Sequence, residues 1–351
     1  MRLGIVGGGQ LARMLALAAH PLGVECLIVE PAEDAPAAAV AEVICAHYDD
    51  TDALDALAAR CDVVTVELEA VPVAALERLA RRVPVRPRPE AIAATQDRLA
   101  EKRLLRSLDV TTAPFDDEVH GLPALVKSRR GGFDGRGNRL VRTNEELATA
   151  RFELPEPIVE GLVPFTREVS MLAARATTGD VRCWPLTVNT HEQGILRTSR
   201  ASSSEPTTQQ RDAEKLAKLV LEALDYVGVL ALELFDVDGE LVANELAPRV
   251  HNSGHWTIDG AVTSQFEQHV RAVCGLPLGD SWAVGASVML NAVGGEPDRD
   301  AILAVPGAHV HLYGKTPRPG RKVGHVTITA PGPALLAARV EAVAPLVPFV
   351  V

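Results

Sequence analysis

The sequence predicts a multidomain α/β protein, and three features of the chain support this prediction. A βαβ pattern with a glycine-rich turn opens the chain at residues 2–30. Short strand and helix patterns alternate after it, up to a proline-rich stretch at residues 84–89. At residues 229–246, two strand-like segments enclose an Asp-Val-Asp-Gly turn. A chain of 351 residues is long enough for two or three domains with cores of their own.

Composition and charge narrow the classes of function. The chain is 47% hydrophobic and 23% charged, and its formal net charge of −11 argues against a general nucleic-acid binder. Five scattered cysteines form neither a disulfide framework nor a zinc pattern. No apolar run approaches the roughly 20 residues that a membrane span needs, and the chain opens on a predicted strand without a signal peptide. We therefore expect a cytoplasmic protein with no membrane and no nucleic-acid partner.

The glycine turn at residues 7–9 joins a predicted strand at 2–7 to a helix, and a second strand at 24–30 ends on Glu30. Gly7, Gly9 and Ala12 approximate the G-x-G-x-x-A pattern of dinucleotide sites, with Glu30 about 20 residues on as a ribose ligand. Any anion can bind at such a helix start. A dinucleotide site, a site for another anion and a tight turn without a ligand therefore all remain open.

The first domain continues with a helix at about 52–60, a strand at 62–67 and a helix at about 73–81. Glu67 and Glu69 lie at the C-terminal end of the predicted parallel strand, where open α/β sheets place ligands. A solvated strand end is the alternative. The prolines at 84–89 mark a linker, which puts the first domain boundary near Ala94.

A glycine-rich, charged stretch, RRGGFDGRGN at residues 129–138, follows a predicted strand at 123–128 that carries Lys127 near its end. Glycine loses much entropy when ordered, so four glycines within seven residues indicate a loop whose N–H groups approach phosphates. A flexible surface hairpin is the alternative. Further strands are expected at 156–165 and at 167–175, where Glu168 faces away from its apolar neighbours, and a helix is expected at about 207–224.

The predicted hairpin at 229–246 carries Glu233, Asn244 and Glu245 where apolar residues would be expected. A three-residue loop with Gly239 in the left-handed region would place Glu233 and Glu245 on the same face, whereas a two-residue Asp-Gly turn would set Glu233 opposite Asn244. Buried charges normally pair or bind metal, and carboxylates beside an amide suit Mg²⁺ held against phosphates. Two edge-strand glutamates that face water are the alternative.

The loop at residues 248–256 is dense in ligand-capable side chains. His251 and His255 have the spacing of a zinc-binding helix, but the neighbouring glycine and proline favour a loop without zinc. A helix at 264–273 and a strand at 286–291 follow. His309 and His311 share a predicted strand face without a third metal ligand, so we expect a packed or solvated pair. A basic loop around residues 315–322 suits a phosphate, or is a solvated turn.

Six segments together resemble the ATP-grasp ligases, and among them the N5-carboxyaminoimidazole ribonucleotide synthetases of purine biosynthesis. They are GGGQLARM (7–14), KSRRGGFDGRGN (127–138), VEGLVPFTREVS (159–170), HEQGILRTS (191–199), NELAPRVHNSGHWT (244–257) and RPGRKVGH (318–325). The resemblance covers nearly the whole chain. It implies an α/β (α+β) ATP-grasp fold with a pre-ATP-grasp domain at 1–94, an ATP-grasp domain at 95–285 whose lid spans about 112–165, and a small C-terminal domain at 286–351. It also implies a homodimer.

The resemblance implies that ATP, bicarbonate and aminoimidazole ribonucleotide are converted to N5-carboxyaminoimidazole ribonucleotide, ADP and phosphate through carboxyphosphate. Mg²⁺, or Mn²⁺ in its place, would be held by Glu233 and Glu245 with help from Asn244. The residues implied for the nucleotide are Arg98, Lys127, Gly132, Phe133, Asp134, Gly135, Arg136, Gly137, Asn138, Glu160, Gly161, Leu162, Val163, Glu168, His191, Asn244 and Glu245. The family often carries tyrosine where this chain has Phe133.

For the ribonucleotide, the resemblance turns the first glycine turn into a substrate site. The implied substrate residues are Gly9, Gln10, Leu11, Glu67, His251, Asn252, Ser253, Lys315 and Arg321, and the implied catalytic residues are Arg249, Asp134, Lys315 and Arg321. Arg249 is assigned to the carboxyphosphate, because a fixed guanidinium suits a trigonal oxyanion.

Four other functions are weighed against this one. A formate-dependent glycinamide ribonucleotide transformylase is the sister interpretation, and HNSGHW and RPGRKVGH favour the synthetase over it. Biotin carboxylase is disfavoured by length. An NAD-dependent oxidoreductase explains only the first glycine turn. A non-catalytic nucleotide-binding protein gives no reason for keeping Lys127, Glu233 and Glu245.

Overall fold

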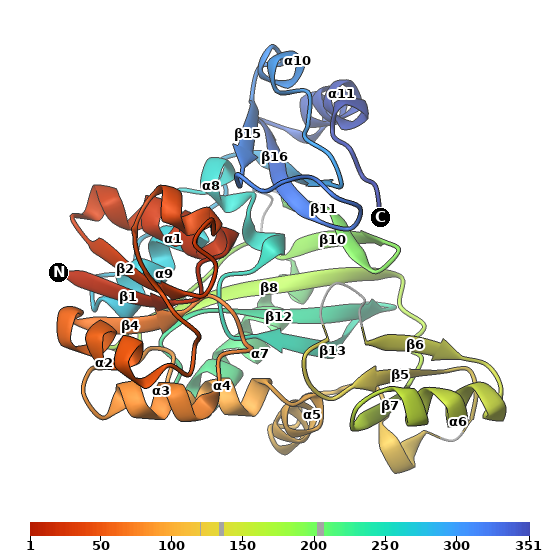
Figure 1. The fold of residues 1–351 in the computed structure, drawn as a ribbon. Coiled ribbons are helices and arrows are strands. Elements are labelled where there is room, and N and C mark those ends of the chain that lie inside the picture. The colour runs from red at the N-terminus through yellow and green to blue at the C-terminus, as the bar shows by residue number, and fades with distance from the viewer. Residues whose placement is uncertain (120, 133–136, 202–206) are drawn as a thin grey trace.

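The computed structural model describes residues 1–119, 121–132, 137–201 and 207–351, which form three β-sheets with helices around them (Figure 1). A parallel sheet contains the N-terminal strands, a long antiparallel sheet runs through the middle, and a small antiparallel sheet lies at the lower right of the view. The C-terminal segment, in blue at the top of the view, contributes the last strands of the long sheet. No helix in the described part of the chain has both the length and the apolar character needed to cross a membrane.

The N-terminal sheet has the strand order β3-β2-β1-β4 and is parallel throughout. Its strands are β1 (Arg2–Val6), β2 (Glu25–Glu30), β3 (Glu42–Cys45) and β4 (Val63–Val66), and its helices are α1 (Gln10–Ala19), α2 (Thr51–Arg60) and α3 (Val73–Ala80). The predicted βαβ unit is therefore confirmed. Strand β3 was not predicted, because its four residues are only partly buried and give no apolar run. Asp50 starts α2 by accepting hydrogen bonds from two backbone N–H groups of the first turn.

The long sheet has the order β13-β12-β8-β10-β11-β14-β16-β15, with β9 paired to the outer part of β8. Its strands are β8 (Arg167–Arg175), β9 (Val181–Cys183), β10 (Thr187–Glu192), β11 (Ile195–Ala201), β12 (Gly228–Val237), β13 (Glu240–Ala247), β14 (Ala286–Val293), β15 (Ala308–Leu312) and β16 (Lys322–Ala330). Helices α7 (Thr208–Ala223), α8 (Thr257–Gly260), α9 (Gln265–Val273), α10 (Arg299–Leu303) and α11 (Pro333–Val343) belong to this half of the chain. The sheet continues without interruption from the hairpin into the C-terminal segment, because β11 pairs with β14.

The hairpin register corrects one prediction. Val237 pairs with Glu240, so the turn is the two-residue Asp238-Gly239 turn, and both of its residues have positive φ. The three-residue loop that the metal hypothesis favoured is therefore wrong. A β-bulge between the pairs Leu234–Ala243 and Glu233–Glu245 shifts the register by one residue. The bulge, and not the turn, brings Glu233 opposite Glu245.

The small sheet has the order β6-β5-β7 and contains β5 (Ala124–Ser128), β6 (Asn138–Val141) and β7 (Pro157–Gly161), with helix α6 (Asn144–Glu153) beside it. Helices α4 (Pro89–Thr95) and α5 (Arg98–Ser107) connect it to the N-terminal sheet. Asp97 caps α5 by accepting a hydrogen bond from the Leu99 N–H group. A small core of its own holds this sheet together, made by Ala124, Val126, Val141, Ala150 and Val159.

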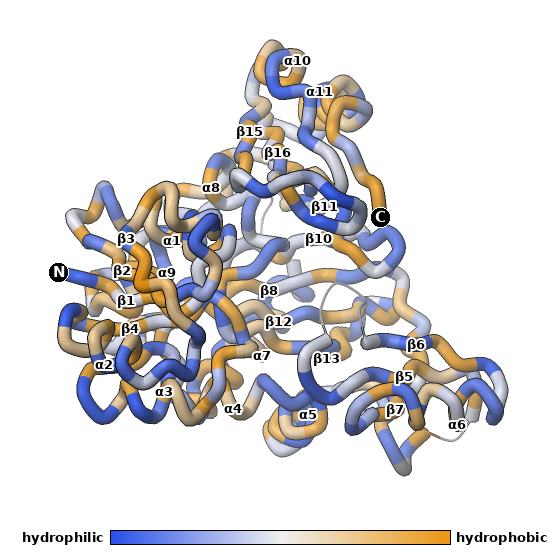
Figure 2. The backbone as a smooth tube through the Cα atoms, in the orientation of Figure 1, coloured by the Kyte–Doolittle hydropathy of each residue, from blue (hydrophilic) through white to orange (hydrophobic). Residues whose placement is uncertain are grey.

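Apolar residues are concentrated in the strands of the N-terminal and long sheets, whereas the outer turns are hydrophilic (Figure 2). The largest core cluster joins α1 and the N-terminal strands to the long sheet, and Trp184 and Trp256 are fully buried in it. His269 of α9 strengthens this junction: its Nδ1 accepts a hydrogen bond from the Val229 N–H group at 3.0 Å, and its Nε2 lies 2.8 Å from the Thr65 hydroxyl. The two sheets are thus fastened by both apolar and polar contacts.

Candidate active site

The glycine turn at the start of α1 is built around the buried carboxylate of Glu67. That carboxylate accepts hydrogen bonds from the Gly9 N–H group at 2.8 Å and from the Ala12 N–H group at 3.0 Å, which are donors that a helix start leaves free. A Cβ added at Gly9 would lie 2.5 Å from a Glu67 oxygen, so the turn needs glycine there. Burial raises the pKa of Glu67, and the two backbone hydrogen bonds act against that rise. The predicted residues Gly9 and Glu67 are therefore in direct contact.

Glu30, which a dinucleotide site would use for a ribose, is engaged with the protein instead. One of its oxygens accepts hydrogen bonds from the Gly8 N–H group at 2.8 Å and from the Tyr48 hydroxyl at 2.7 Å. Its other oxygen accepts one from the Ala32 N–H group at 3.1 Å. These contacts hold the turn against β2, which gives Glu30 a structural task.

The hairpin carboxylates Glu233 and Glu245 face each other across β12 and β13, and each already has a cationic or polar partner. Nε2 of His251 lies 2.9 Å from Glu233, and a guanidinium nitrogen of Arg98 lies 2.6 Å from Glu245. Burial acts to raise the pKa of Glu233, but the contact with His251 outweighs it and lowers this pKa to about 2. Two carboxylate side chains therefore stand side by side at the bulge.

These carboxylates fit the predicted Mg²⁺. The described residues contain no group of three or more His, Cys, Asp or Glu side chains that could hold a metal by themselves. Mg²⁺ usually keeps waters and is bound through one or two carboxylates together with phosphates, so an all-protein cage is not needed. The zinc alternative fails on geometry, because His251 contacts Glu233 whereas the His255 ring lies beside those of Phe266 and His325.

Two lysines and one glutamate form a buried cluster between the small sheet and the hairpin. Lys127 of β5 lies 2.9 Å from one oxygen of Glu160, and Lys102 of α5 lies 3.2 Å from the other. Lys127 also donates to the Asn244 side-chain oxygen at 3.4 Å. The structure thus brings together Lys127, Glu160 and Asn244 as predicted. Lys102 was missed, because a lysine in a helix rich in Arg and Lys reads as part of a solvated face.

The described ends of the glycine-rich loop approach the same cluster. Arg98 donates to the Gly132 carbonyl at 3.0 Å, and the Ser128 N–H group donates to the Gly137 carbonyl at 2.8 Å. Asn138 begins β6 and pairs with Lys127. The predicted residues Phe133, Asp134, Gly135 and Arg136 lie outside the described residues.

Further along the predicted nucleotide site, Glu168 of β8 forms an ion pair with His191 of β10. Burial acts to lower the pKa of His191, but the contact with Glu168 raises it above its ordinary value. Gly161 ends β7, and the segment with Leu162 and Val163 follows directly, with the Leu162 side chain exposed. Strand β8 borders the hairpin strand β12, strand β10 lies on the other side of β8, and β7 belongs to the small sheet.

Arg249 lies where the glycine turn meets the hairpin. One of its guanidinium nitrogens is 2.6 Å from Glu69, and its charge also acts on Glu67 and on Glu245. Burial acts to raise the pKa of Glu69, and Arg249 more than offsets this, so the pKa of Glu69 is lowered. The Arg249 guanidinium thus lies between the carboxylates of the glycine turn and that of Glu245, which connects the predicted substrate and nucleotide halves of the site.

The segment after the hairpin is fixed by a buried hydrogen-bond chain. Ser253 lies 2.8 Å from Nδ1 of His251 and accepts from the Ser170 hydroxyl at 2.8 Å; Ser170 accepts in turn from the Asn189 amide at 3.0 Å. Because Nδ1 of His251 also accepts from the Ser253 N–H group, its Nε2 carries the proton that faces Glu233. The Asn252 side-chain amide is different: both its oxygen and its nitrogen are buried without a partner among the described residues. A buried amide of this kind calls for a ligand or water.

The C-terminal loop reaches back to the glycine turn. Lys315 contacts the side-chain oxygen of Gln10, although the two residues are 305 positions apart. Arg321, in the same loop, donates to the Thr316 carbonyl at 3.2 Å. The Leu11 side chain is part of the core, so Leu11 would reach a ligand through its backbone. His309 and His311 both face Asp259, with nitrogen–oxygen distances of 3.6 and 2.8 Å; the His311 side chain is 26% exposed and the His309 side chain 44%, so the pair is packed at one residue and more solvated at the other.

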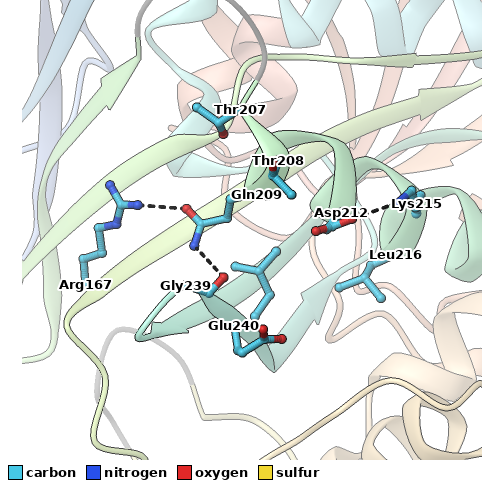
Figure 3. Close-up of a pocket in the computed structure, with 10 residues that line it drawn as sticks. Arg167, Thr207, Thr208, Gln209, Asp212, Lys215, Leu216, Gly239 and Glu240 are labelled. Carbon is cyan, nitrogen blue, oxygen red and sulfur yellow. Dashed lines mark hydrogen bonds and ion pairs between the residues drawn. The ribbon is translucent and has the colours of Figure 1, made fainter.

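An open pocket lies elsewhere, where the tip of the hairpin meets α7, and its lining includes none of the predicted site residues. Figure 3 shows that its polar groups bond to one another: Arg167 donates to Gln209 at 2.8 Å, Gln209 donates to the Gly239 carbonyl, and Lys215 pairs with Asp212. The convergent charges of the molecule are therefore at the hairpin bulge and the glycine turn, not in this pocket.

Comparison with known proteins identifies three consecutive domain types along the chain. Residues 1–96 match the ribonucleotide synthetase preATP-grasp domain, residues 104–266 the ATP-grasp domain, and residues 287–339 the phosphoribosylaminoimidazole carboxylase C-terminal domain. The chain is 47% identical over 360 residues to an N5-carboxyaminoimidazole ribonucleotide synthase of Pseudomonas aeruginosa, with 99% of each chain covered.

Solved structures agree with this match. The fold is similar to that of the N5-carboxyaminoimidazole ribonucleotide synthetase of Thermus thermophilus, with a TM-score of 0.93, 48% identity and 98% of each chain covered. It is also similar to the Aspergillus clavatus enzyme solved with ATP, with a TM-score of 0.90, 30% identity and coverage of 99% of this chain and 98% of that one. The same enzyme solved with ADP and 5-aminoimidazole ribonucleotide gives a TM-score of 0.88 and 29% identity at the same coverage.

Proposed function

The chain belongs to the N5-carboxyaminoimidazole ribonucleotide synthase family of ATP-grasp ligases, and on this premise we propose how its residues share the work of the reaction. It uses ATP to carboxylate 5-aminoimidazole ribonucleotide to N5-carboxyaminoimidazole ribonucleotide in purine biosynthesis. The finer proposal is that bicarbonate attacks the γ-phosphate to give ADP and carboxyphosphate, and that the substrate amine then captures the carboxyl group, or the CO₂ released from carboxyphosphate, while phosphate leaves. One observation carries the division of roles: the bulge that sets Glu233 opposite Glu245, between the lysine cluster and the glycine turn.

On the nucleotide side of the bulge, Lys127 and Arg98 would hold the phosphates, together with the glycine-rich loop. Glu168 would accept from the ribose, and the backbone after Glu160 would line the adenine. Glu233 and Glu245 would hold Mg²⁺, which when bound offsets the charge of the phosphates. Because phosphoryl transfer needs little covalent help from the protein, positioning and charge neutralisation are the main contributions of these side chains.

On the substrate side, the turn at Gly9 and Gln10 would receive the ribonucleotide, with Lys315 closing over it from the C-terminal loop. The contact between Lys315 and Gln10 supports this role, and so does the buried, unpartnered amide of Asn252 among the described residues. Arg249 would stabilise the carboxyphosphate, because its guanidinium is held by Glu69 between the two halves of the site. Glu67 keeps the turn in shape through its two backbone hydrogen bonds.

The deciding experiment measures ADP formation from ATP, bicarbonate and Mg²⁺, with and without aminoimidazole ribonucleotide. Strong stimulation by that substrate, and its loss in Glu245→Gln, would support the reaction and the metal site together. Removal of Mg²⁺ with a chelator should abolish ADP formation. Stimulation by glycinamide ribonucleotide with formate would point to the sister ligase instead. The matched control is Glu240→Gln, an exposed glutamate at the start of the same strand, which should behave as wild type.

We also propose that the protein works in the cytoplasm as a homodimer. An exposed apolar patch supports the second copy: Val262, Trp282 and Val284 are each at least 59% exposed, and the Val262 N–H group donates to the Trp282 carbonyl. Large exposed apolar side chains grouped in this way are typical of a protein–protein contact.

A further inference from the structure

Lys102 is a buried charged side chain that has no role in the proposed reaction so far. It lies on α5, one helical turn after Arg98, and only 1% of it is exposed. Its ammonium group contacts an oxygen of Glu160 at 3.2 Å and the backbone carbonyl of Asn244 at 3.4 Å. A lysine is almost never fully buried unless it is paired, and burying one is costly. The burial of this charge therefore needs an explanation.

The reason lies in how Glu160 is shared. Lys127 contacts the second oxygen of the same carboxylate at 2.9 Å, and it also contacts Asn244, at the side-chain oxygen. Two ammonium groups thus flank one carboxylate from opposite ends, and all three side chains are at most 6% exposed. Within these three side chains there is one positive charge more than Glu160 can offset, and the charge of Glu101 also acts on Lys102. In a medium of low polarity this surplus favours the arrival of an anion.

We propose that Lys102 is a positioning residue for nucleotide binding, because its charge offsets part of the charge of Glu160 and so leaves the charge of Lys127 available to a phosphate. Without Lys102, Lys127 would be the sole partner of a buried carboxylate and would be held by it. The inference rests on the proposed role of Lys127 as a phosphate ligand. Lys102 itself does not touch the reacting atoms, since its contacts are to Glu160 and to the Asn244 backbone.

The test is the dissociation constant of ATP, measured by calorimetry without bicarbonate or aminoimidazole ribonucleotide. Lys102→Met keeps the apolar stem and removes the charge, and we expect it to weaken ATP binding about 10-fold, which is the effect of one charge-assisted hydrogen bond. The KM for aminoimidazole ribonucleotide should stay within about 2-fold of wild type, because the glycine turn is not involved. In the double variant Lys102→Met/Glu160→Gln, Lys127 is released again, so ATP affinity should return to within about 3-fold of wild type.

Each outcome separates the inference from the role on which it rests. A purely structural role of Lys102 would leave the double variant as weak as Lys102→Met or weaker, and this would overturn the proposal, as would wild-type affinity in Lys102→Met. Lys127→Met tests the underlying role: unchanged ATP affinity there would refute Lys127 as a phosphate ligand, whatever Lys102 does. If Lys102→Met does not fold, Lys102→Gln serves the same purpose, since its amide can still donate to Glu160 but carries no charge.

Discussion

Replacing Gly9 with alanine tests whether the glycine turn is shaped by Glu67. The added Cβ would lie 2.5 and 3.0 Å from the two carboxylate oxygens and 3.2 Å from Cδ, well inside van der Waals contact. Because Gly7 fixes the turn at a φ of 103°, we expect the carboxylate to withdraw rather than the backbone. Glu67 would then lose its hydrogen bonds from the Gly9 and Ala12 N–H groups.

The size of the effect follows from those two bonds. A hydrogen bond to a charged group contributes at least about 1.5 kcal/mol, so losing both costs about 3 kcal/mol in local stability. Since Glu67 is only 8% exposed, water cannot replace the two donors. About 3 kcal/mol corresponds to about 100-fold faster amide hydrogen exchange in residues 7–14, measured by mass spectrometry. The KM for aminoimidazole ribonucleotide should rise as well, because the same turn is its proposed site.

Two controls make the test specific. Gly332→Ala adds a Cβ that meets no atom within 4 Å at an extended backbone, so exchange in residues 7–14 should not change. In a Glu67→Ala background the clash partner is absent, and Gly9→Ala should cost much less than in wild type. An equal cost in both backgrounds, or exchange within about 2-fold of wild type in Gly9→Ala, would refute the reasoning.

Three further predictions concern pH, chemistry and assembly. Burial lowers the pKa of His269 from 6.5 to about 4, so between these pH values the unfolded chain binds a proton that the folded chain does not. The free energy of unfolding should therefore fall by about 3 kcal/mol as the pH drops from 6.5 to 4. In urea unfolding, His269→Asn should flatten this part of the pH profile, and an unchanged slope in that variant would contradict the prediction. Arg249→Ala should slow ADP formation about 100-fold or more, and recovery in Arg249→Ala/Glu69→Ala would mean that the loss came from the unpaired Glu69 alone. Trp282→Glu should convert the dimer to a monomer in sedimentation velocity, whereas the control Phe152→Glu, at another exposed apolar residue, should not. A monomeric wild-type protein would refute the proposed dimer.

Apart from β3, the strands and helices of the N-terminal unit could be predicted, because buried apolar residues recur at strand and helix periods there. The hairpin pairing could not. Its sequence allowed two turns, and the observed pairing of Glu233 with Glu245 depends on a bulge at Asn244 that leaves no mark in the hydrophobic pattern. A polar residue in a strand was the one available signal, and it fits either register.

Charged residues of the site could be predicted where they lie in recognisable motifs, but a charged residue inside a charged helix gives no such signal. Arg98, at the start of α5, was among the predicted nucleotide residues, whereas Lys102 lies one turn later in a helix whose other cations make it look like part of a solvated face. Their burial becomes visible only when the small sheet and the hairpin are placed on either side of α5. Likewise, Glu30 occupies the position of a ribose ligand in the sequence, and only its contacts with Gly8 and Tyr48 give it a structural task.

The pairing of β11 with β14 has a consequence for the chain as it leaves the ribosome. The N-terminal sheet closes with β4, so its strands can pair while the rest is still being made. The edge of β11 that will pair with β14, in contrast, stays unpaired from the synthesis of Ala201 until Ala286 is made. This interval lasts roughly 4 to 17 seconds at typical elongation rates. An unpaired strand edge is a template for wrong partners. By pairing with β11, strand β14 therefore also protects the long sheet from aggregation. Shortened chains that end before β14 should be prone to self-association.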